Sequence, residues 1–212
     1  PAGSTCKPVA CIAALSEGQV TLADRFYCTG YAPVYPKKKC WRGHGLEDII
    51  AGFKNSCNIV FYDLGRRIGP DKLAEFARMF GLGQLTGIEL PGERKGLVPD
   101  MTWKQRVYKE RWYMPETMDF AIGQGFLNMT PIQLGQVYMA LANSGTIYRP
   151  MLVRKILNPD GSLNKVLRPK VSRRIPLDKD ALKIVHRGLE AVTSEEIGRA
   201  SCRERVEISV VA

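Results

Sequence analysis

A short helix that is apolar on nearly every side constrains this chain more than any other feature. Residues 4–17 read as a helix, and its stretch from Val9 to Leu15 carries only apolar side chains. A helix without a polar face has to be covered on all sides, so we expect it to lie at the centre of the molecule. Pro8 falls in the first turn, where a missing N–H costs little, and Gly18 ends the helix. A chain of 212 residues is long enough to build such a core within one domain.

The rest of the pattern predicts further helices and antiparallel strands around this centre. We expect helices over residues 46–55, 59–64, 72–80, 131–143 and 178–192. A strand hairpin is predicted from residues 148–157 and 163–167, which flank Asn158-Pro159-Asp160-Gly161. Residues 19–45 combine Gly, Pro and aromatic residues without steady periodicity, which indicates a long loop that something has to hold in place.

The composition excludes several classes of protein. With 45% hydrophobic and 25% charged residues the chain is an ordinary globular one, and no run approaches the ~18 apolar residues of a membrane span. No basic-then-apolar leader follows Pro1, so we expect any targeting address to belong to a longer parent. The 31 Lys and Arg against 21 Asp and Glu give a formal charge of +10. These basic residues are spread out and no nucleic-acid-binding motif accompanies them, so we expect no nucleic-acid partner.

Ser4 and Lys7 lie three residues apart at the start of the predicted central helix. At 3.6 residues per turn, both side chains point from the same face. A serine hydroxyl is a weak nucleophile until a base takes its proton, and a lysine becomes a base when burial and nearby charge lower its pKa. The N–H groups at a helix N-terminus also face an oxyanion that forms there. Ser-x-x-Lys alone is a frequent sequence, so an ordinary capped helix stays open as an alternative at this point.

A second motif, Ser56-Cys57-Asn58, lies between two predicted helices, where a turn can present a hydroxyl and an amide to a cleft. The hydroxyl can pass a proton between the lysine and a leaving group, and the amide can hold a substrate carbonyl. Ser-x-x-Lys followed by Ser-x-Asn is the motif pair of the penicillin-recognising serine enzymes. The two motifs together therefore favour acyl transfer by Ser4, with Lys7 as its base.

The similarity to penicillin-recognising serine enzymes extends beyond the two motifs, over residues 1–193. The matching segments are Pro1 to Pro8, Gly43-His44-Gly45 with the second motif, Gly69 to Gly92, and Gly123-Gln124-Gly125 with Thr130 to Leu134. Over these segments the chain resembles the penicillin-binding protein 2 family, the class B transpeptidases of bacterial cell-wall elongation. The resemblance implies an α+β, penicillin-binding transpeptidase fold of the serine β-lactamase-like type. In that fold an antiparallel sheet packs between helices, and we expect it to be incomplete at both ends.

The resemblance also implies roles and partners. Ser4 would be the acylated nucleophile, Lys7 its base, and Ser56 with Asn58 the second catalytic element. Peptidoglycan stem peptides ending in D-Ala-D-Ala would be the donors, and an amine of a neighbouring stem peptide would resolve the acyl-enzyme. Water in place of that amine would make the same site a carboxypeptidase, and β-lactam antibiotics would trap it covalently. The family acts at the periplasmic face of the bacterial inner membrane with cell-elongation proteins, through a membrane anchor that lies outside this sequence.

The chain departs from the family pattern in one motif and in its tail. The third motif of the family, Lys-Thr/Ser-Gly, supplies an oxyanion-hole N–H and binds the substrate carboxylate, and it does not occur in this sequence. We therefore predict a partial transpeptidase domain over residues 1–194. The tail over residues 195–212 does not resemble the family and reads as a floppy terminus or an unrelated sequence. We expect this polypeptide to be impaired in activity, whatever its parent does.

Three cysteines and one histidine, Cys28, Cys40, His44 and Cys57, form a candidate structural zinc set. Three residues separate Cys40 from His44, close enough for one ion to be bound from a single turn. A metal would tie the long predicted loop to the second motif and fix the pose of that motif. Some members of the resembled family carry a metal site in this region. A disulfide and simple buried thiols remain as alternatives.

Several other residues carry weaker signals. Gly123-Gln124-Gly125 reads as a substrate-binding backbone turn beside the cleft, or as a break between a strand and a loop. An aromatic group mixed with Lys and Arg would grip glycan or peptide, or would pack as a loop on the core; it comprises Trp103, Tyr108, Trp112 and Tyr113.

The remaining cysteines and the second histidine receive structural interpretations. We expect Cys6 and Cys11 to be buried thiols and His186 to be a surface residue, and we assign nothing to Cys202 in the tail.

Three other functions fit part of this pattern. A serine β-lactamase shares the first two motifs, although the long loop and the run from Gly123 to Leu134 argue against it. A β-lactam-acylated sensor would be acylated without turnover. A non-catalytic fragment that retains only zinc binding would give a metal signal without acylation.

Overall fold

The computed structural model describes residues 1–35 and 37–194. The helices are the 3-10 turn η1 (Gly3–Cys6), α1 (Lys7–Ser16), α2 (Ile49–Lys54), α3 (Asn58–Ile68), α4 (Pro70–Met79), α5 (Met101–Tyr108), α6 (Met114–Ala121), α7 (Pro131–Ala142) and α8 (Lys179–Ser194). The strands are β1 (Phe26–Cys28), β2 (Gly45–Glu47), β3 (Thr146–Tyr148), β4 (Lys155–Leu157), β5 (Leu163–Val166) and β6 (Val171–Arg174). The predicted tail and Cys202 lie outside the described residues.

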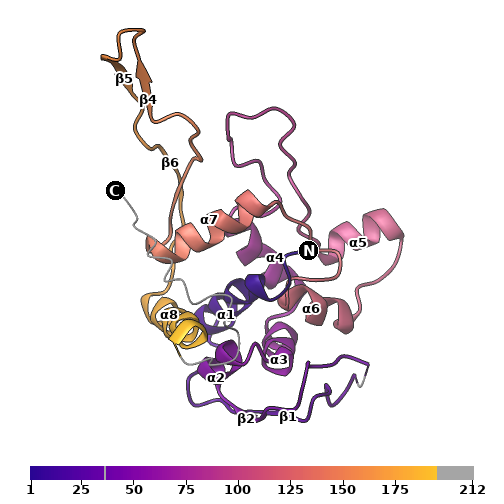
Figure 1. The fold of residues 1–212 in the computed structure, drawn as a ribbon. Helices are drawn as coiled ribbons and strands as arrows, with labels where there is room; N and C mark the ends of the chain where they lie inside the picture. The colour runs from indigo at the N-terminus through magenta and orange to yellow at the C-terminus, as the bar shows by residue number, and fades with distance from the viewer. Residues whose placement is uncertain (36, 195–212) are drawn as a thin grey trace.

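Helix α1 occupies the centre of the molecule, as its apolar sequence predicts. Figure 1 shows α1 enclosed by α3, α4, α6 and α8, and each of these helices contacts it. Cys11, Ile12 and Ala13 have no exposed surface, and the thiol of Cys6 is likewise buried. The first turn of the predicted helix is a 3-10 turn, η1, which leads directly into α1. No described helix has the length and apolar character to cross a membrane.

The strands form three separate two-stranded antiparallel sheets within the described residues. β1 pairs with β2, β3 with β6, and β4 with β5. The β4–β5 pair matches the turn end of the predicted hairpin, and it projects away from the helices at the top of Figure 1. The first predicted strand, 148–157, was too long, because Tyr148 belongs to β3 and pairs with Val171 of β6. The strands are antiparallel, as expected, but they are distributed over small sheets, and the described residues hold no single large sheet between helix layers.

The prediction for residues 46–55 was wrong at its start, because Leu46 belongs to β2 and is 67% exposed. Helix α2 begins at Ile49, since the Asp48 carboxylate accepts a hydrogen bond from the Ala51 N–H (2.8 Å) and caps the helix there. The preceding residues extend to pair with β1, whose Cys28 lies opposite Gly45. The long loop predicted over residues 19–45 therefore ends in a short strand pair.

Helices α5 and α6 were not predicted from the sequence pattern. The aromatic group of this region packs within the protein: the Trp103 ring lies 5.5 Å from that of Tyr108 and 5.2 Å from that of Phe126. Trp112 Nε1–H donates to Thr117 Oγ1 (2.8 Å). These contacts agree with the structural interpretation of the aromatic group, and a glycan-gripping role stays a prediction.

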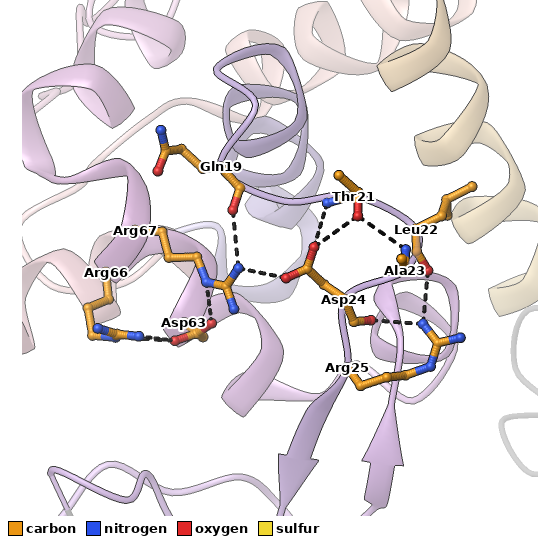
Figure 2. A network of polar contacts seen from close by, with 9 residues as sticks. All are labelled: Gln19, Thr21, Leu22, Ala23, Asp24, Arg25, Asp63, Arg66 and Arg67. Carbon is orange, nitrogen blue, oxygen red and sulfur yellow. Dashed lines mark hydrogen bonds and ion pairs between the residues drawn. The ribbon is translucent and has the colours of Figure 1, made fainter.

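A network of charged residues fastens the start of the long loop to α3 (Figure 2). The Asp24 carboxylate accepts hydrogen bonds from Thr21 N–H (2.8 Å), Thr21 Oγ1 (3.0 Å) and Arg67 (2.8 Å). Arg67 also donates to Asp63 (2.7 Å) on its own helix and to the Gln19 carbonyl (3.1 Å). The segment that enters β1 is thus fixed against the helix whose N-terminus carries the second motif.

Candidate active site

Ser4 and Lys7 lie at the junction of η1 and α1, but their surroundings differ. Ser4 is exposed, whereas Lys7 is only 2% exposed and points into the protein. Gly3 has φ +63°, a left-handed conformation that suits glycine, and it directs the chain into the 3-10 turn. The nucleophile candidate is therefore accessible, and the candidate base is sheltered from water one turn below it.

The structure brings the two sequence motifs into one hydrogen-bonded group. Lys7 Nζ lies 3.0 Å from Ser56 Oγ, 2.8 Å from the Ser56 carbonyl oxygen and 2.9 Å from Asn58 Oδ1. Ser56 Oγ lies 3.1 Å from Ser4 Oγ. Ser4, Ser56 and Lys7 thus form a continuous path along which hydroxyl protons can be exchanged.

The backbone of Ser56 is in an uncommon conformation, with φ +48°. It lies between α2 and α3, and its N–H bonds to the Phe53 carbonyl (2.9 Å). For a residue other than glycine this left-handed conformation costs on the order of 1 kcal/mol or more, so surrounding contacts must hold it. The consequence is that Ser56 presents its carbonyl oxygen and its hydroxyl to the same nitrogen, Lys7 Nζ.

Gly123 brings a distant segment against the start of η1. Gly3 N–H donates to the Gly123 carbonyl (2.9 Å), and Gly123 has φ +72°. A Cβ at Gly123 would lie 2.3 Å from the Gly3 carbonyl oxygen and 2.7 Å from Cys6 Cβ, so no larger side chain fits. Gln124 beside it is exposed and Gly125 has φ +67°. The predicted substrate-binding turn therefore lies beside Ser4, and its role in binding stays a prediction.

The four candidate metal ligands also converge. The ligand atoms of Cys28, Cys40, His44 and Cys57 all lie within 4.8 Å of one another. His44 Nδ1 is 3.5 Å from the sulfurs of Cys28 and Cys40, and the sulfurs of Cys40 and Cys57 are 4.0 Å apart. That separation is twice a disulfide bond length of about 2.05 Å, so the cysteines are free thiols and the disulfide alternative does not hold.

The pKa shifts differ among the members of this cluster. Burial and the charges of Arg42 and Lys7 lower the pKa of His44, which keeps the imidazole neutral. Burial alone would raise the pKa of Cys40, but hydrogen bonds from main-chain N–H groups, first that of Asn58 (3.2 Å), outweigh it and lower the pKa. Burial raises the pKa of Cys57. A cation would favour the thiolate forms of all the cysteines present.

The sequence did not reveal the residues outside the two motifs that hold the Asn58 side chain. Asn58 Nδ2–H donates to the Lys39 carbonyl (3.1 Å), and Tyr62 reaches the same oxygen at 3.5 Å. Lys38 forms an ion pair with Asp119 (2.5 Å). No sequence signal could have found the Lys39 contact, because a main-chain carbonyl looks the same for every residue type.

Cys6, Cys11 and His186 are packed within the protein. Cys11 is a buried free thiol, as predicted, and so is Cys6. His186 is half-buried on α8, where its Nε2 lies 2.9 Å from the Leu141 carbonyl oxygen. It is therefore a packed residue between α8 and α7, more enclosed than the surface position expected from the sequence.

A buried helix that begins with Ser-x-x-Lys and meets a Ser-x-Asn turn defines the class of penicillin-recognising serine proteins. The family model of the penicillin binding protein transpeptidase domain matches residues 1–211. The chain therefore belongs to the penicillin-binding protein transpeptidase family.

Curated relatives are similar over most of this chain. It is 34% identical over 201 residues to stage V sporulation protein D of Bacillus subtilis, covering 93% of this chain and 30% of that protein. It is 35% identical over 158 residues to the peptidoglycan D,D-transpeptidase MrdA of Escherichia coli K12, covering 72% of this chain and 25% of that protein. The chain thus spans less than a third of the length of these relatives.

Solved structures agree with this assignment. Pseudomonas aeruginosa PBP2 in complex with WCK 5153 is 36% identical with a TM-score of 0.76, over 89% of this chain and 43% of that one. Helicobacter pylori PBP2 in its complex with MreC is 25% identical with a TM-score of 0.74, over 92% of this chain and 35% of that one. The fold class predicted from the sequence is therefore confirmed as the penicillin-binding transpeptidase type.

Proposed function

We propose that the protein to which these residues belong is a peptidoglycan D,D-transpeptidase that works through an acyl-enzyme on Ser4. The observation that carries this proposal is the hydrogen-bonded group of Ser4, Ser56, Lys7 and Asn58. It supplies a nucleophile, a proton path, a base and an amide in one place. The D,D-transpeptidase relatives support the substrate class, a peptidoglycan stem peptide ending in D-Ala-D-Ala.

The acylation step follows from this geometry. The Ser4 hydroxyl gives its proton through Ser56 to the neutral form of Lys7, and Ser4 Oγ bonds to the carbonyl carbon of the penultimate D-Ala. The C–N bond to the terminal D-Ala then breaks, and the proton returns along the same path to the departing amine. An ester between Ser4 and the donor peptide remains.

The second half of the reaction reverses these proton movements. An amine of a neighbouring stem peptide attacks the ester carbon and gives its proton to the path, which returns it to Ser4 Oγ as the ester bond breaks. The product is a cross-link between two peptides. When water attacks instead, the same steps release the peptide as a carboxypeptidase product. A β-lactam acylates Ser4 in the same way: its lactam C–N bond breaks and the nitrogen takes up the proton, but that nitrogen remains tethered to the acyl group through the rest of the opened ring.

We propose further that the parent protein is anchored in the bacterial inner membrane, with this part on the periplasmic face. There it would act together with cell-elongation proteins. The Helicobacter pylori PBP2 that forms a complex with MreC supports the elongation partners.

Intact mass after incubation with benzylpenicillin tests the acylation step. One penicillin adduct is expected on the chain, and none on Ser4→Ala. An adduct that persists on Ser4→Ala would refute the assignment of the nucleophile. Loss of the adduct within minutes as penicilloate is released would favour the β-lactamase alternative. A stable adduct without any transfer to an added amine acceptor would favour the sensor alternative.

We propose that Cys28, Cys40, His44 and Cys57 hold a structural Zn²⁺ ion. Bond lengths of about 2.3 Å to sulfur and about 2.0 Å to nitrogen put tetrahedral ligand atoms roughly 3.5–3.8 Å apart. The two S–N separations of 3.5 Å and the S–S separation of 4.0 Å are close to these values, and all four ligand atoms lie within 4.8 Å of one another. The three cysteine sulfurs and the His44 imidazole would close the coordination sphere, so the ion would serve a structural purpose. It would hold the 28–44 segment against the second motif, next to Asn58.

Cobalt substitution gives a direct test of the metal proposal. Co²⁺ added to the metal-free protein should give the visible absorption of a tetrahedral, thiolate-rich site at one ion per chain. Cys57→Ser should weaken this absorption and lower the Zn²⁺ content. Cys11→Ala, which removes a buried thiol outside the cluster, should change neither. Equal metal binding by the protein and by Cys57→Ser would refute the proposed ligand set.

A further inference from the structure

The orientation of Asn58 depends on one loop residue that belongs to neither motif. Its amide nitrogen donates to the Lys39 carbonyl (3.1 Å), which leaves its amide oxygen facing Lys7 Nζ at 2.9 Å. An amide that lost the Lys39 contact could rotate and present its nitrogen, a donor, to Lys7 Nζ, which donates to the amide oxygen in the observed arrangement. The position of the Lys39 carbonyl therefore decides whether the Asn58 amide oxygen can accept a hydrogen bond from Lys7.

Hydrogen bonds within the loop that carries Lys39 fix its internal shape. Ala32 N–H bonds to the Lys38 carbonyl (2.9 Å), Lys38 N–H to the Tyr35 carbonyl (2.8 Å) and Cys40 N–H to the Gly30 carbonyl (2.9 Å). Its position on the protein is set by contacts to other elements. After Lys39 these include the hydrogen bonds of Trp41 Nε1–H to the Asn55 carbonyl (2.9 Å) and of Asn58 N–H to Cys40 Sγ (3.2 Å).

The ion pair between Lys38 and Asp119 provides such a contact from the residue next to Lys39. The two charged atoms are 2.5 Å apart, and the side chains are only 22% and 27% exposed. Such partial burial protects a pair from screening by salt and water. A long side chain fixed at its tip also limits the movement of its own backbone, which here adjoins the carbonyl that holds Asn58.

Asp119 belongs to the segment that lines the other side of the site. It lies in α6, and its main-chain carbonyl accepts from Gln124 N–H (2.8 Å) in the predicted substrate-binding turn. The preceding residue of this turn, Gly123, accepts a hydrogen bond through its carbonyl from Gly3 N–H (2.9 Å), beside Ser4. The ion pair therefore closes a ring of contacts around the site, from Ser4 through α6 and the loop to Asn58.

We propose that Lys38 and Asp119 are positioning residues, which hold the Lys39 carbonyl in place and so orient the Asn58 amide toward Lys7. The expected effect on acylation rests on the proposed function, whereas the expected effect on the Asn58 amide does not. Neither residue is assigned a contact with the substrate. Both act through Asn58.

Asp119→Asn is the primary variant, because it removes the charge and keeps the shape of the side chain. In ¹⁵N-labelled protein, the side-chain NH₂ of Asn58 should exchange with water faster, by roughly three- to tenfold for the loss of a half-buried ion pair. The penicillin acylation rate should fall, on the order of 10- to 100-fold for a misplaced catalytic group. Zn²⁺ content should stay unchanged, because no metal ligand is altered.

Controls separate positioning from general loss of stability. Asp180→Asn breaks the exposed pair with Lys183, whose side chains are 83% and 74% exposed, and should alter neither readout. The exchanged pair Lys38→Asp with Asp119→Lys should restore slow exchange at Asn58 and recover most of the acylation rate. If Asp119→Asn does not fold, Lys38→Met is expected to give the same two changes.

The outcomes distinguish this proposal from the proposed function. Unchanged Asn58 exchange in a folded Asp119→Asn or Lys38→Met variant would overturn the positioning proposal. So would faster exchange that the exchanged pair does not reverse. If the unmodified chain is not acylated by penicillin at all, the proposed function is refuted for this polypeptide, and the exchange measurement still decides the role of the ion pair.

Discussion

Replacing Gly123 by alanine should damage both the stability and the candidate active site of this protein. The residue has φ +72°, where an L-residue other than glycine is strained. Its new Cβ would lie 2.3 Å from the Gly3 carbonyl oxygen and 2.7 Å from Cys6 Cβ. The obstacles are a main-chain oxygen and the buried Cys6 side chain of η1, and neither can move aside cheaply.

Two contributions determine the expected loss of stability in Gly123→Ala. The left-handed conformation costs about 1–2 kcal/mol for alanine, and an overpacked contact adds about 1–3 kcal/mol. We therefore expect Gly123→Ala to lower the free energy of unfolding by about 2–5 kcal/mol, a large part of the total for a domain of this size. Because the Gly3 carbonyl must move, Ser4 next to it should also shift, and penicillin acylation should slow in the folded fraction.

Urea unfolding followed by circular dichroism measures the effect, with Gly135→Ala as the matched control. Gly135 lies within α7, and a Cβ there would meet nothing within 4 Å. Alanine in that helix interior should stabilise the protein by about 0.5–1 kcal/mol. A Gly123→Ala variant within about 0.5 kcal/mol of the parent would refute the reasoning, because such a value is typical of harmless surface changes.

Three further changes have defined outcomes. Thr130→Ala removes the side chain that caps α7 at Gln133 N–H (3.2 Å), and should lower the unfolding free energy by about 1 kcal/mol in urea. Gly188→Ala should lower the midpoint of thermal unfolding, because its Cβ would lie 2.4 Å from the Phe53 ring; an unchanged midpoint would contradict that packing. The Arg67 hydrogen bond holds the pKa of Asp24 below its ordinary value. The stability gained from this carboxylate is complete above about pH 4 and is lost as pH falls through the lower, folded-state pKa, so Asp24→Asn should flatten the acid side of a stability–pH curve.

The local sequence was sufficient to identify the parts of the candidate site. Ser4 and Lys7 could be placed on one face of a helix because helical spacing depends only on neighbouring residues. The apolar stretch from Val9 to Leu15 located that helix in the core for the same reason, and Ile12 within it is fully buried. The four candidate metal ligands could be chosen by chemical type, since sulfur and imidazole are the groups that zinc prefers.

Local patterns failed where contacts between distant segments decided the outcome. Leu46 looked helical by its spacing, but pairing of β2 with β1 and the Asp48 cap moved the start of α2 to Ile49. Helix α6 was missed, although it carries Asp119 and leads into the Gly123 turn. Tertiary contacts override weak local preferences in such short elements.

The sequence by itself determined the nucleophile candidate, the base candidate and the second motif, because each is defined by residue type at short spacing. Only the tertiary structure decided how they are held. It brought the Lys39 carbonyl to Asn58, the Lys38 charge to Asp119, and the Gly123 carbonyl to the start of the central helix. Main-chain carbonyls are present at every position and N–H groups at nearly every one, so a contact made through them cannot be recognised from the residue types in the sequence.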